Sequence, residues 1–277
     1  MTGTAVTGAA VPGSAVTFLV LGCTRDAGDL ATRLQLAGIP VICALLGPVT
    51  RQAPVPPVEV LSGGFGGVEG FVRFLAERRV RGVVDARHPF AVGISPDALV
   101  ATRAAGVSLV RLLPPAWEAQ GPPPHWRWVD DHAHARRITE GLGVDRPFLS
   151  VGGRSLASYT RWADRYVLAR VAELPTWPAP ERWEVIRSPE THAYSSEYAL
   201  LANRRIGVMV TRDTGGPLST PKLRAAEDLG VFVVMVRRPA SPAGLRVVQS
   251  VDDAYAWVAR HWRPQDFASP SPGRQSR

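Results

Sequence analysis

The amino-acid sequence predicts an α/β fold in which parallel β-sheets are covered by helices. Short apolar runs rich in β-branched residues, such as VTFLVLG at 16–22 and VFVVMV at 231–236, are typical of buried strands. Segments between such runs carry apolar residues at helical spacing, as in Ala27, Leu30, Ala31 and Leu34. Strands that alternate with helices of about 10 residues indicate parallel sheets with helices on both faces.

The first half of the chain contains one such alternating series. Strands are predicted at 16–22, 40–46, 58–61, 81–85 and 107–112, and helices at 27–37, 68–78 and 95–105. Gly38 follows the first of these helices, as expected of a residue that ends a helix. The proline-rich stretch PPAWEAQGPPPHW at 114–126 then interrupts the series and is typical of a connection between domains.

The second half of the chain resumes the alternation. Helices are predicted at 131–142, 155–163, 194–204, 220–230 and 251–262, with strands at 146–152, 165–172, 184–188, 206–212 and 231–239. Pro221 suits the first turn of its helix, behind a Ser219 or Thr220 cap. We therefore expect two Rossmann-like α/β domains with parallel sheets, at 16–125 and 126–263, whose strand ends face an inter-domain cleft. Residues 1–15 and 264–277 have the composition of disordered ends.

Composition narrows the class of protein. The start of the chain has no Lys or Arg ahead of its apolar stretch, and no uncharged apolar run approaches the roughly 18 residues of a membrane span. These features favour a soluble, cytoplasmic protein without a membrane partner. Cys23 and Cys43 lie in or beside apolar runs and are expected to be reduced thiols, and no His/Cys cluster suggests a metal site.

The net charge of +8 favours an anionic partner. The arginines are scattered and form no basic run, so nucleic acid is a weak interpretation. A small polyanion, such as a phosphate cofactor or a polycarboxylate substrate, explains the charge equally well.

The loop LGCTRDAGDLA at 21–31 joins the first strand to the first helix. Its residues Gly22, Thr24 and Arg25 stand where helix-terminal N–H groups hold phosphate, although a plain tight turn explains them as well. No Asp or Glu lies between Asp29 and Glu59, and Arg51 follows the second strand. If a dinucleotide binds here, the 2′-phosphate of NADP fits better than a free ribose hydroxyl. The alternative is a solvent-exposed arginine on a loop.

Two further loops follow strands of the first half. SGGFGGVEG at 62–70 contains Gly63, Gly64, Phe65 and Gly66, which permit close backbone approach to a ligand with a ring available for stacking; a surface turn is the alternative. DARHPFA at 85–91 begins with Asp85 at the end of a strand. His88 could transfer a proton near neutral pH, or it could only bond the backbone while Asp85 caps a turn.

The segment TRDTGGPLSTPKL at 211–223 is a strand, loop and helix in the second half. Its Arg212, Thr214, Gly215, Gly216 and Lys222 make an anion cradle, with a capped helix and a charged first turn as the alternative.

Taken in order, these motifs resemble the precorrin-6A reductase family of cobalamin biosynthesis, over about 16–262. GGFGG followed by Glu69-Gly70 matches closely, DARHPFA resembles D-A-T-H-P-F-A with Arg87 for threonine, and Arg111, Pro115 and Trp117 resemble R-L-x-R-P-x-W. TRDTGG resembles K-N-S-G-G, and 222–239 resembles the segment after it.

Two departures concern the C-terminal half. Arg212, Asp213 and Thr214 replace lysine, asparagine and serine, and Arg187-Ser188-Pro189-Glu190 replaces R-G-P-F. An arginine in place of a lysine keeps the charge but changes the geometry, while Asp213 adds a negative charge beside an expected anion site.

The resemblance implies NADPH-dependent reduction of one double bond of the precorrin-6A macrocycle to give precorrin-6B. It implies that Gly22, Thr24, Arg25, Arg51 and the glycine loop hold NADPH, and that Asp85 and His88 have positioning roles. Phe90, Arg111, Arg212, Thr214, Gly215, Gly216 and Lys222 would contact the substrate or bind its anionic groups. This substrate is a small-molecule tetrapyrrole polycarboxylate. Reduction of another unsaturated compound and non-catalytic tetrapyrrole or dinucleotide binding are the alternatives.

Overall fold

The computed structural model describes residues 16–45, 57–91, 94–188 and 193–262, which fold into two compact units. Unit 1 combines the chain up to Leu113 with the chain from Ser241 onward, and unit 2 is Pro114–Ala240. Each unit contains a six-stranded sheet. All the strand pairs within these sheets are parallel.

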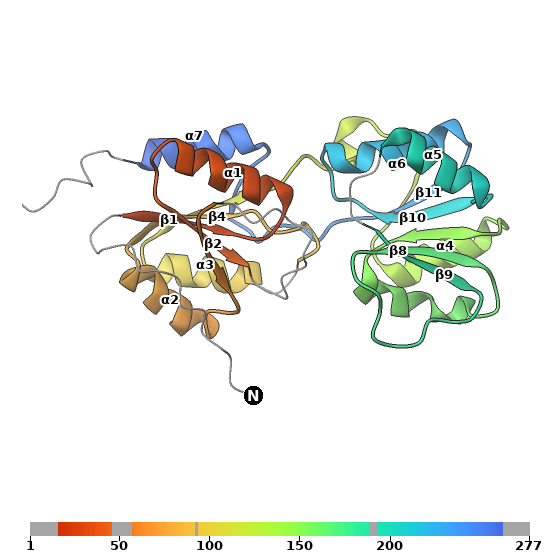
Figure 1. Ribbon diagram of the computed structural model, residues 1–277, viewed down its shortest axis with the longest axis horizontal. Helices are drawn as coiled ribbons and strands as arrows, with labels where there is room; N and C mark the ends of the chain where they lie inside the picture. The colour runs from red at the N-terminus through yellow and green to blue at the C-terminus, as the bar shows by residue number, and fades with distance from the viewer. Residues whose placement is uncertain (1–15, 46–56, 92–93, 189–192, 263–277) are drawn as a thin grey trace, which may run out of the picture. The chain divides into compact units, whose positions relative to one another are not determined.

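Unit 1 is built on the sheet β12-β5-β4-β1-β2-β3. Its strands are β1 (Thr17–Leu21), β2 (Val41–Leu45), β3 (Glu59–Ser62), β4 (Val80–Asp85), β5 (Ser108–Leu112) and β12 (Arg246–Val248). Helices α1 (Arg25–Leu36) and α7 (Val251–His261) cover one face, and α2 (Gly67–Glu77) and α3 (Ile94–Ala104) cover the other (Figure 1). The central strand β1 is entirely buried because its alternate side chains enter the cores on both faces.

Unit 2 is built on the sheet β6-β11-β10-β7-β8-β9. Its strands are β6 (Arg127–Val129), β7 (Pro147–Ser150), β8 (Val167–Val171), β9 (Trp183–Arg187), β10 (Val208–Arg212) and β11 (Phe232–Val236). Helices α5 (Tyr194–Asn203) and α6 (Thr220–Asp228) pack together on one face, and α4 (His132–Gly141) packs with the 3₁₀ segment η2 (Gly153–Trp162) on the other (Figure 1). Two short 3₁₀ turns, η1 (Glu118–Gln120) and η3 (Pro217–Ser219), complete the described elements.

The two sheets share one strand order. Numbered along the chain from the first central strand, five strands of each sheet follow the order 3-2-1-4-5, and a sixth strand extends the edge beside the fifth. The direction of winding reverses between β1 and β4 in unit 1 and between β7 and β10 in unit 2. The expected fold of two Rossmann-like α/β units is therefore confirmed. The inter-domain cleft stays a prediction.

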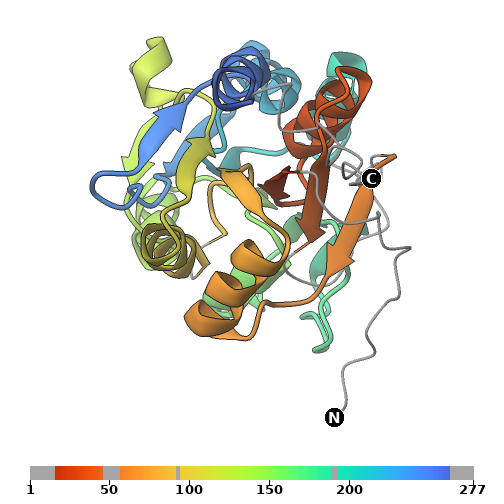
Figure 2. The ribbon, with the colours of Figure 1, turned by 90° about the vertical axis from the view of Figure 1, so that its left-hand side faces the viewer.

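The units differ from the predicted domains 16–125 and 126–263. The segment 114–125 belongs to unit 2, and the chain returns to unit 1 after Ala240. There β12 pairs with β5, and α7 buries Ala254, Trp257 and Val258 in the core beside α1. Figure 2 shows the blue strand β12 alongside the yellow β5. The apolar pattern of α7 predicts a helix with one buried face, but it does not indicate which sheet that face covers.

Three elements differ from the predicted secondary structure. The three-residue strands β6 and β12 were not predicted, because so short a run carries no periodic signal. The segment predicted as a helix at 155–163 is the 3₁₀ segment η2. It begins at Gly153, directly after Gly152, whose φ is 80°. Within the described residues, no helix has the length and apolar character needed to cross a membrane.

Candidate active site

The first and third predicted loops meet at the switch point of unit 1. In an open parallel sheet, ligands bind beyond the carboxyl ends of the strands where the strand order reverses. Gly22, directly after β1, has φ 124°, and a Cβ built on it would lie 2.9 Å from the backbone of Ala86 and Arg87 after β4. Glycine is needed here because the two loop backbones touch.

The Thr24 side chain links these two loops through hydrogen bonds. Its hydroxyl accepts a hydrogen bond from the N–H of Ala27 (3.2 Å), which caps α1, and donates one to the carbonyl oxygen of Ala86 (2.7 Å). The Thr24 hydroxyl, predicted to bind a cofactor, thus has a structural role between the two loops. Arg25 begins α1 and lies exposed, 3.8 Å from Asp29.

Asp85 lies at the end of β4 between two guanidinium groups. Arg87 donates to both carboxylate oxygens, from Nε at 2.8 Å and from Nη2 at 2.9 Å, and Arg111 Nη1 lies 3.7 Å away. All three residues are at least 95% buried. Burial alone would raise the pKa of Asp85, but the hydrogen bond and charge of Arg87 and the charge of Arg111 together hold that pKa below its usual value.

This cluster involves Arg111, a predicted anion-binding residue, and Arg87, for which no role was predicted. Arg111 was expected to bind phosphate or carboxylate groups, and the structure instead buries its guanidinium against Asp85. Arg87, which stands where the family motif has threonine, supplies the bidentate partner of that carboxylate. Two buried arginines thus pack against one carboxylate at this switch point.

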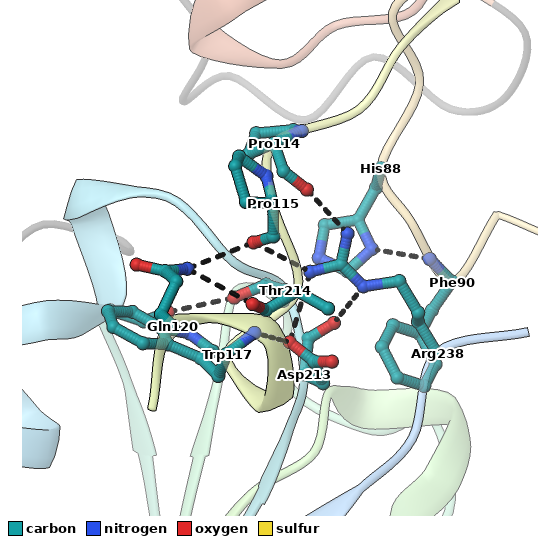
Figure 3. A network of polar contacts seen from close by, with 11 residues as sticks. His88, Phe90, Pro114, Pro115, Trp117, Gln120, Asp213, Thr214 and Arg238 are labelled. Carbon is teal, nitrogen blue, oxygen red and sulfur yellow. Dashed lines mark hydrogen bonds and ion pairs between the residues drawn. The ribbon is translucent and has the colours of Figure 1, made fainter. Parts of the chain in front are cut away.

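His88 forms a hydrogen bond with the backbone, which was the alternative to a proton-transfer role for this residue. The N–H of Phe90 donates to Nδ1 of His88 at 3.1 Å, a contact drawn in Figure 3. Because Nδ1 accepts, the ring is neutral in this arrangement and carries its hydrogen on Nε2. The rings of His88 and Phe90 are tilted toward each other with centroids 6.0 Å apart.

The glycine loop after β3 lies at the same carboxyl edge of the sheet. Added Cβ atoms on Gly63, Gly64 and Gly66 would meet nothing within 4 Å, so the loop presents bare backbone. The ring of Phe65, predicted to be available for stacking on a ligand, stacks on Phe71 with centroids 4.1 Å apart and is partly buried against the core. The Phe65 carbonyl oxygen would lie 1.8 Å from a Cβ on Gly70, which explains the glycine of the Glu69-Gly70 pair.

The switch point of unit 2 gathers a second set of polar groups. Lys222, near the start of α6, donates to Ser150 Oγ at the end of β7 (3.1 Å). The Arg212 guanidinium, at the end of β10, lies against Gly152, where a Cβ would be 3.0 Å from Nη2. Arg212 and Lys222 thus lie at the same carboxyl edge, as the predicted anion cradle requires.

The rest of the predicted cradle has structural contacts. Thr214 and Ser219 share a hydrogen bond of 2.8 Å between their hydroxyls, so Ser219 stands at the start of α6 without capping it through its side chain. Gly215 was expected to bind an anion, but a Cβ there would lie 2.3 Å from the carbonyl oxygen of Pro115. Gly216 lies beside Pro114. These glycines allow the proline-rich segment that begins at Pro114 to pack closely against the loop after β10.

Asp213 does not repel an anion, because it is neutralised by Arg238. Arg238 Nη2 lies 3.0 Å from Asp213 Oδ1, which also accepts from the backbone N–H of Trp117 at 3.0 Å. Arg238 further donates to the carbonyl oxygens of Pro114 (2.7 Å) and Pro115 (3.4 Å), as Figure 3 shows. This Asp213–Arg238 network ties the start of unit 2 to the ends of β10 and β11.

Sequence reasoning missed Ser150, Gly152 and His132. The first two lie in SVGGR at 150–154, where two glycines follow an apolar strand just as in the predicted loops. The sequence therefore contained a signal for Ser150 and Gly152. It contained none for His132, because only packing brings that residue to the same edge. Arg51 lies outside the described residues, among which no group of His, Cys, Asp or Glu is placed to hold a metal ion.

Two doubly wound parallel sheets with polar loops at their switch points define a Rossmann-type α/β protein. The family model of the precorrin-6x reductase CbiJ/CobK matches residues 17–259. Because this match spans most of its length, the chain belongs to the precorrin-6x reductase family.

Similar proteins agree with this assignment. A precorrin-6A reductase of Mycobacterium tuberculosis is 38% identical over 87% of this chain and 96% of its own length. One of Rhodococcus erythropolis is 34% identical, with the same two coverages. The solved structure of a CobK precorrin-6A reductase covers 89% of this chain and 97% of its own, with a TM-score of 0.77 at 30% identity.

Proposed function

We propose that the chain reduces precorrin-6A to precorrin-6B in cobalamin biosynthesis, with NADPH as the reductant. One carbon–carbon double bond of the macrocycle accepts a hydride from NADPH on one carbon and a proton on its neighbour, and NADP⁺ is released. The observation that carries the proposal is the switch point of unit 1, where the loops after β1 and β4 are held in contact at the carboxyl edge of a Rossmann-type sheet. Membership of the reductase family supports the reaction class.

The loop between β1 and α1 supports dinucleotide binding in this unit. Thr24 fixes the first turn of α1, whose N-terminal N–H groups attract phosphate. The absence of any acidic residue between Asp29 and Glu59 removes the usual acceptor for a free ribose hydroxyl. We therefore propose NADPH in preference to NADH, with Arg25 and Arg51 as partners of its phosphates.

The carboxyl edge of unit 2 supports binding of a polycarboxylate. Lys222 lies at the Ser150 hydroxyl and Arg212 lies against Gly152, and such cations pair well with the acetate and propionate side chains of a tetrapyrrole. Both relatives described above are named precorrin-6A reductases, so we propose the metal-free macrocycle as the substrate.

Catalysis in this proposal is mainly a matter of positioning. When bound, the nicotinamide would supply the hydride, and the residues of the site would position it for the conjugated ring. Asp85 keeps the loop after β4 in place through Arg87, and His88 keeps Phe90 in place through its backbone N–H. His88 and Asp85 are therefore proposed as positioning residues.

Anaerobic incubation with precorrin-6A, followed by mass spectrometry of the tetrapyrrole, tests this function. We expect a gain of two hydrogens with NADPH, little gain with NADH, and slower turnover of the cobalt-containing macrocycle. Arg51→Ala should raise the KM for NADPH while leaving that for NADH unchanged. Arg33→Ala, in the last turn of α1, is the matched control and should change neither. An unchanged mass with active cofactor and a working control enzyme would refute the proposed reaction.

A further inference from the structure

His132 lies at the carboxyl edge of the unit 2 sheet without a role in the site described so far. It is the first residue of α4, which begins just beyond the carboxyl end of β6. Because the sheet is parallel throughout, this is the edge that carries Ser150 and Arg212. Helix α4 packs on η2, β10 and β11, and Nδ1 of His132 lies 2.9 Å from the hydroxyl of Tyr159 in η2.

The Tyr159 hydroxyl determines which ring nitrogen of His132 carries hydrogen. Tyr159 is fully buried, and burial, with the charge of Asp131, raises the pKa of its phenol, so the O–H stays protonated. A buried O–H has to donate, and His132 Nδ1 is the acceptor that the described part of the chain provides. Nδ1 is therefore the unprotonated nitrogen, and the neutral ring carries its hydrogen on Nε2.

The environment of the His132 ring favours its neutral form. Burial and then the positive charge of Arg212 lower the pKa of His132, while Asp131 at the cap of α4 acts in the opposite direction. The charged groups that act on the ring are thus Arg212 from β10 and Asp131 from the start of α4, and Tyr159 from η2 is its hydrogen-bond partner. Protonation would also replace the acceptor at Nδ1 by a donor and break the Tyr159 hydrogen bond.

We propose that His132 is a further binding residue, whose Nε2–H donates a hydrogen bond to an oxyanion held by Arg212 at the carboxyl edge of unit 2. This proposal deepens and rests on the proposed function. The oxyanion is a substrate carboxylate or a cofactor phosphate, which present the same acceptor oxygens. A neutral donor beside Arg212 adds direction to the binding without adding a second buried charge.

The first test is independent of activity. Long-range ¹H–¹⁵N correlation spectra of the full chain should show His132, assigned by loss of its signal in His132→Gln, as the Nε2–H form that stays neutral through pH 7. Tyr159→Phe should populate both tautomers. A ring protonated at pH 7, or one with hydrogen on Nδ1, would overturn the proposal even if the enzyme is active.

The second test measures binding. His132→Leu should weaken binding of the molecule that carries the oxyanion, substrate or cofactor, about 10-fold or more. This is the loss expected for a hydrogen bond to a charged group. His132→Gln, which retains a donor, should stay within about threefold. His134→Gln on another face of α4 is the matched control and should have no effect. Thermal unfolding of each variant separates loss of binding from loss of folding.

The two sources of oxyanion are distinguished by separate titrations. A higher Kd for NADPH, measured by nicotinamide fluorescence, identifies a phosphate, whereas a higher KM for precorrin-6A at unchanged kcat identifies a carboxylate. Unchanged values for both in folded His132→Leu would overturn the proposal. If the wild-type protein does not reduce precorrin-6A, the proposed function fails, whereas the NMR and NADPH titrations still decide on the tautomer and on phosphate binding.

Discussion

Gly22 and Gly38 illustrate how identical residues serve different purposes in unit 1. Both have positive φ, at 124° and 71°. Gly38 ends α1 in open space, so only its backbone conformation favours glycine. Gly22 lies against the backbone of Ala86 and Arg87, so a side chain there would also separate the loops after β1 and β4.

Gly22→Ala should therefore be the more damaging of the two substitutions. We expect it to lower the free energy of unfolding by about 2–4 kcal/mol, from backbone strain and displacement of the loop after β4. Gly38→Ala should cost only about 1 kcal/mol, from the left-handed conformation alone. Urea unfolding of both variants measures the difference. Equal losses would contradict the close approach of the two loops.

The side chains of the site divide into those that sequence could place and those that it could not. The order of strands and loops predicted that Asp85 ends a buried strand and that His88 follows it, and this is confirmed. Their partners were not predictable. The pairing of Asp85 with Arg111 depends on β4 and β5 lying side by side in register, and the stacking of Phe65 on Phe71 depends on how its loop meets α2.

At the scale of elements, the Asp213–Arg238 network fixes the first residues of unit 2. Asp213 follows β10 and Arg238 follows β11, and together they bind Pro114, Pro115 and Trp117. Both members of the ion pair are largely buried. A buried pair of this kind is strongly destabilising when one partner is removed, because the other charge is left without compensation.

Asp213→Ala should accordingly lower the free energy of unfolding by about 3–5 kcal/mol. Asp213→Asn, which introduces the asparagine of the family motif, should cost clearly less, because its amide oxygen still accepts from Trp117 and Arg238. Asp130→Ala removes an exposed partner of Arg237 and should change stability by less than about 1 kcal/mol. Chemical denaturation of the three variants checks this order, and a neutral Asp213→Ala would show that the network is dispensable.

Most helices and strands were predictable because their apolar pattern is local. Helices α1, α2 and α7 follow from helical spacing, and the buried strands of both sheets follow from β-branched runs. The exceptions lack such a pattern. Strands β6 and β12 are stabilised by pairing with β11 and β5.

At the scale of the molecule, the chain leaves unit 1 after Leu113 and returns to it after Ala240. Unit 2 is therefore one continuous segment with all six strands of its sheet. Unit 1 is discontinuous, and its core beside α1 needs Val248, Ala254, Trp257 and Val258 from the returning segment. Loss of these side chains would expose apolar surface of α1, β4 and β5.

The two units should consequently behave differently as fragments. A fragment of 114–240 should fold by itself and unfold cooperatively, whereas 1–113 should lack a stable fold until a peptide of 241–262 is added. Circular dichroism and the dispersion of amide signals in ¹H–¹⁵N spectra distinguish folded from unfolded fragments. A stably folded 1–113 fragment would contradict the requirement for β12 and α7.

The sequence by itself determined the fold class, the alternation of strands and helices, and the loops that carry the polar residues, because these depend on local patterns and on the order of motifs. Tertiary structure decided which unit receives β12 and α7, which partners neutralise Asp85 and Asp213, and how His132 comes to the edge that carries Arg212. These features depend on pairing and packing between residues distant in the chain, and such contacts exist only after the sheets have formed.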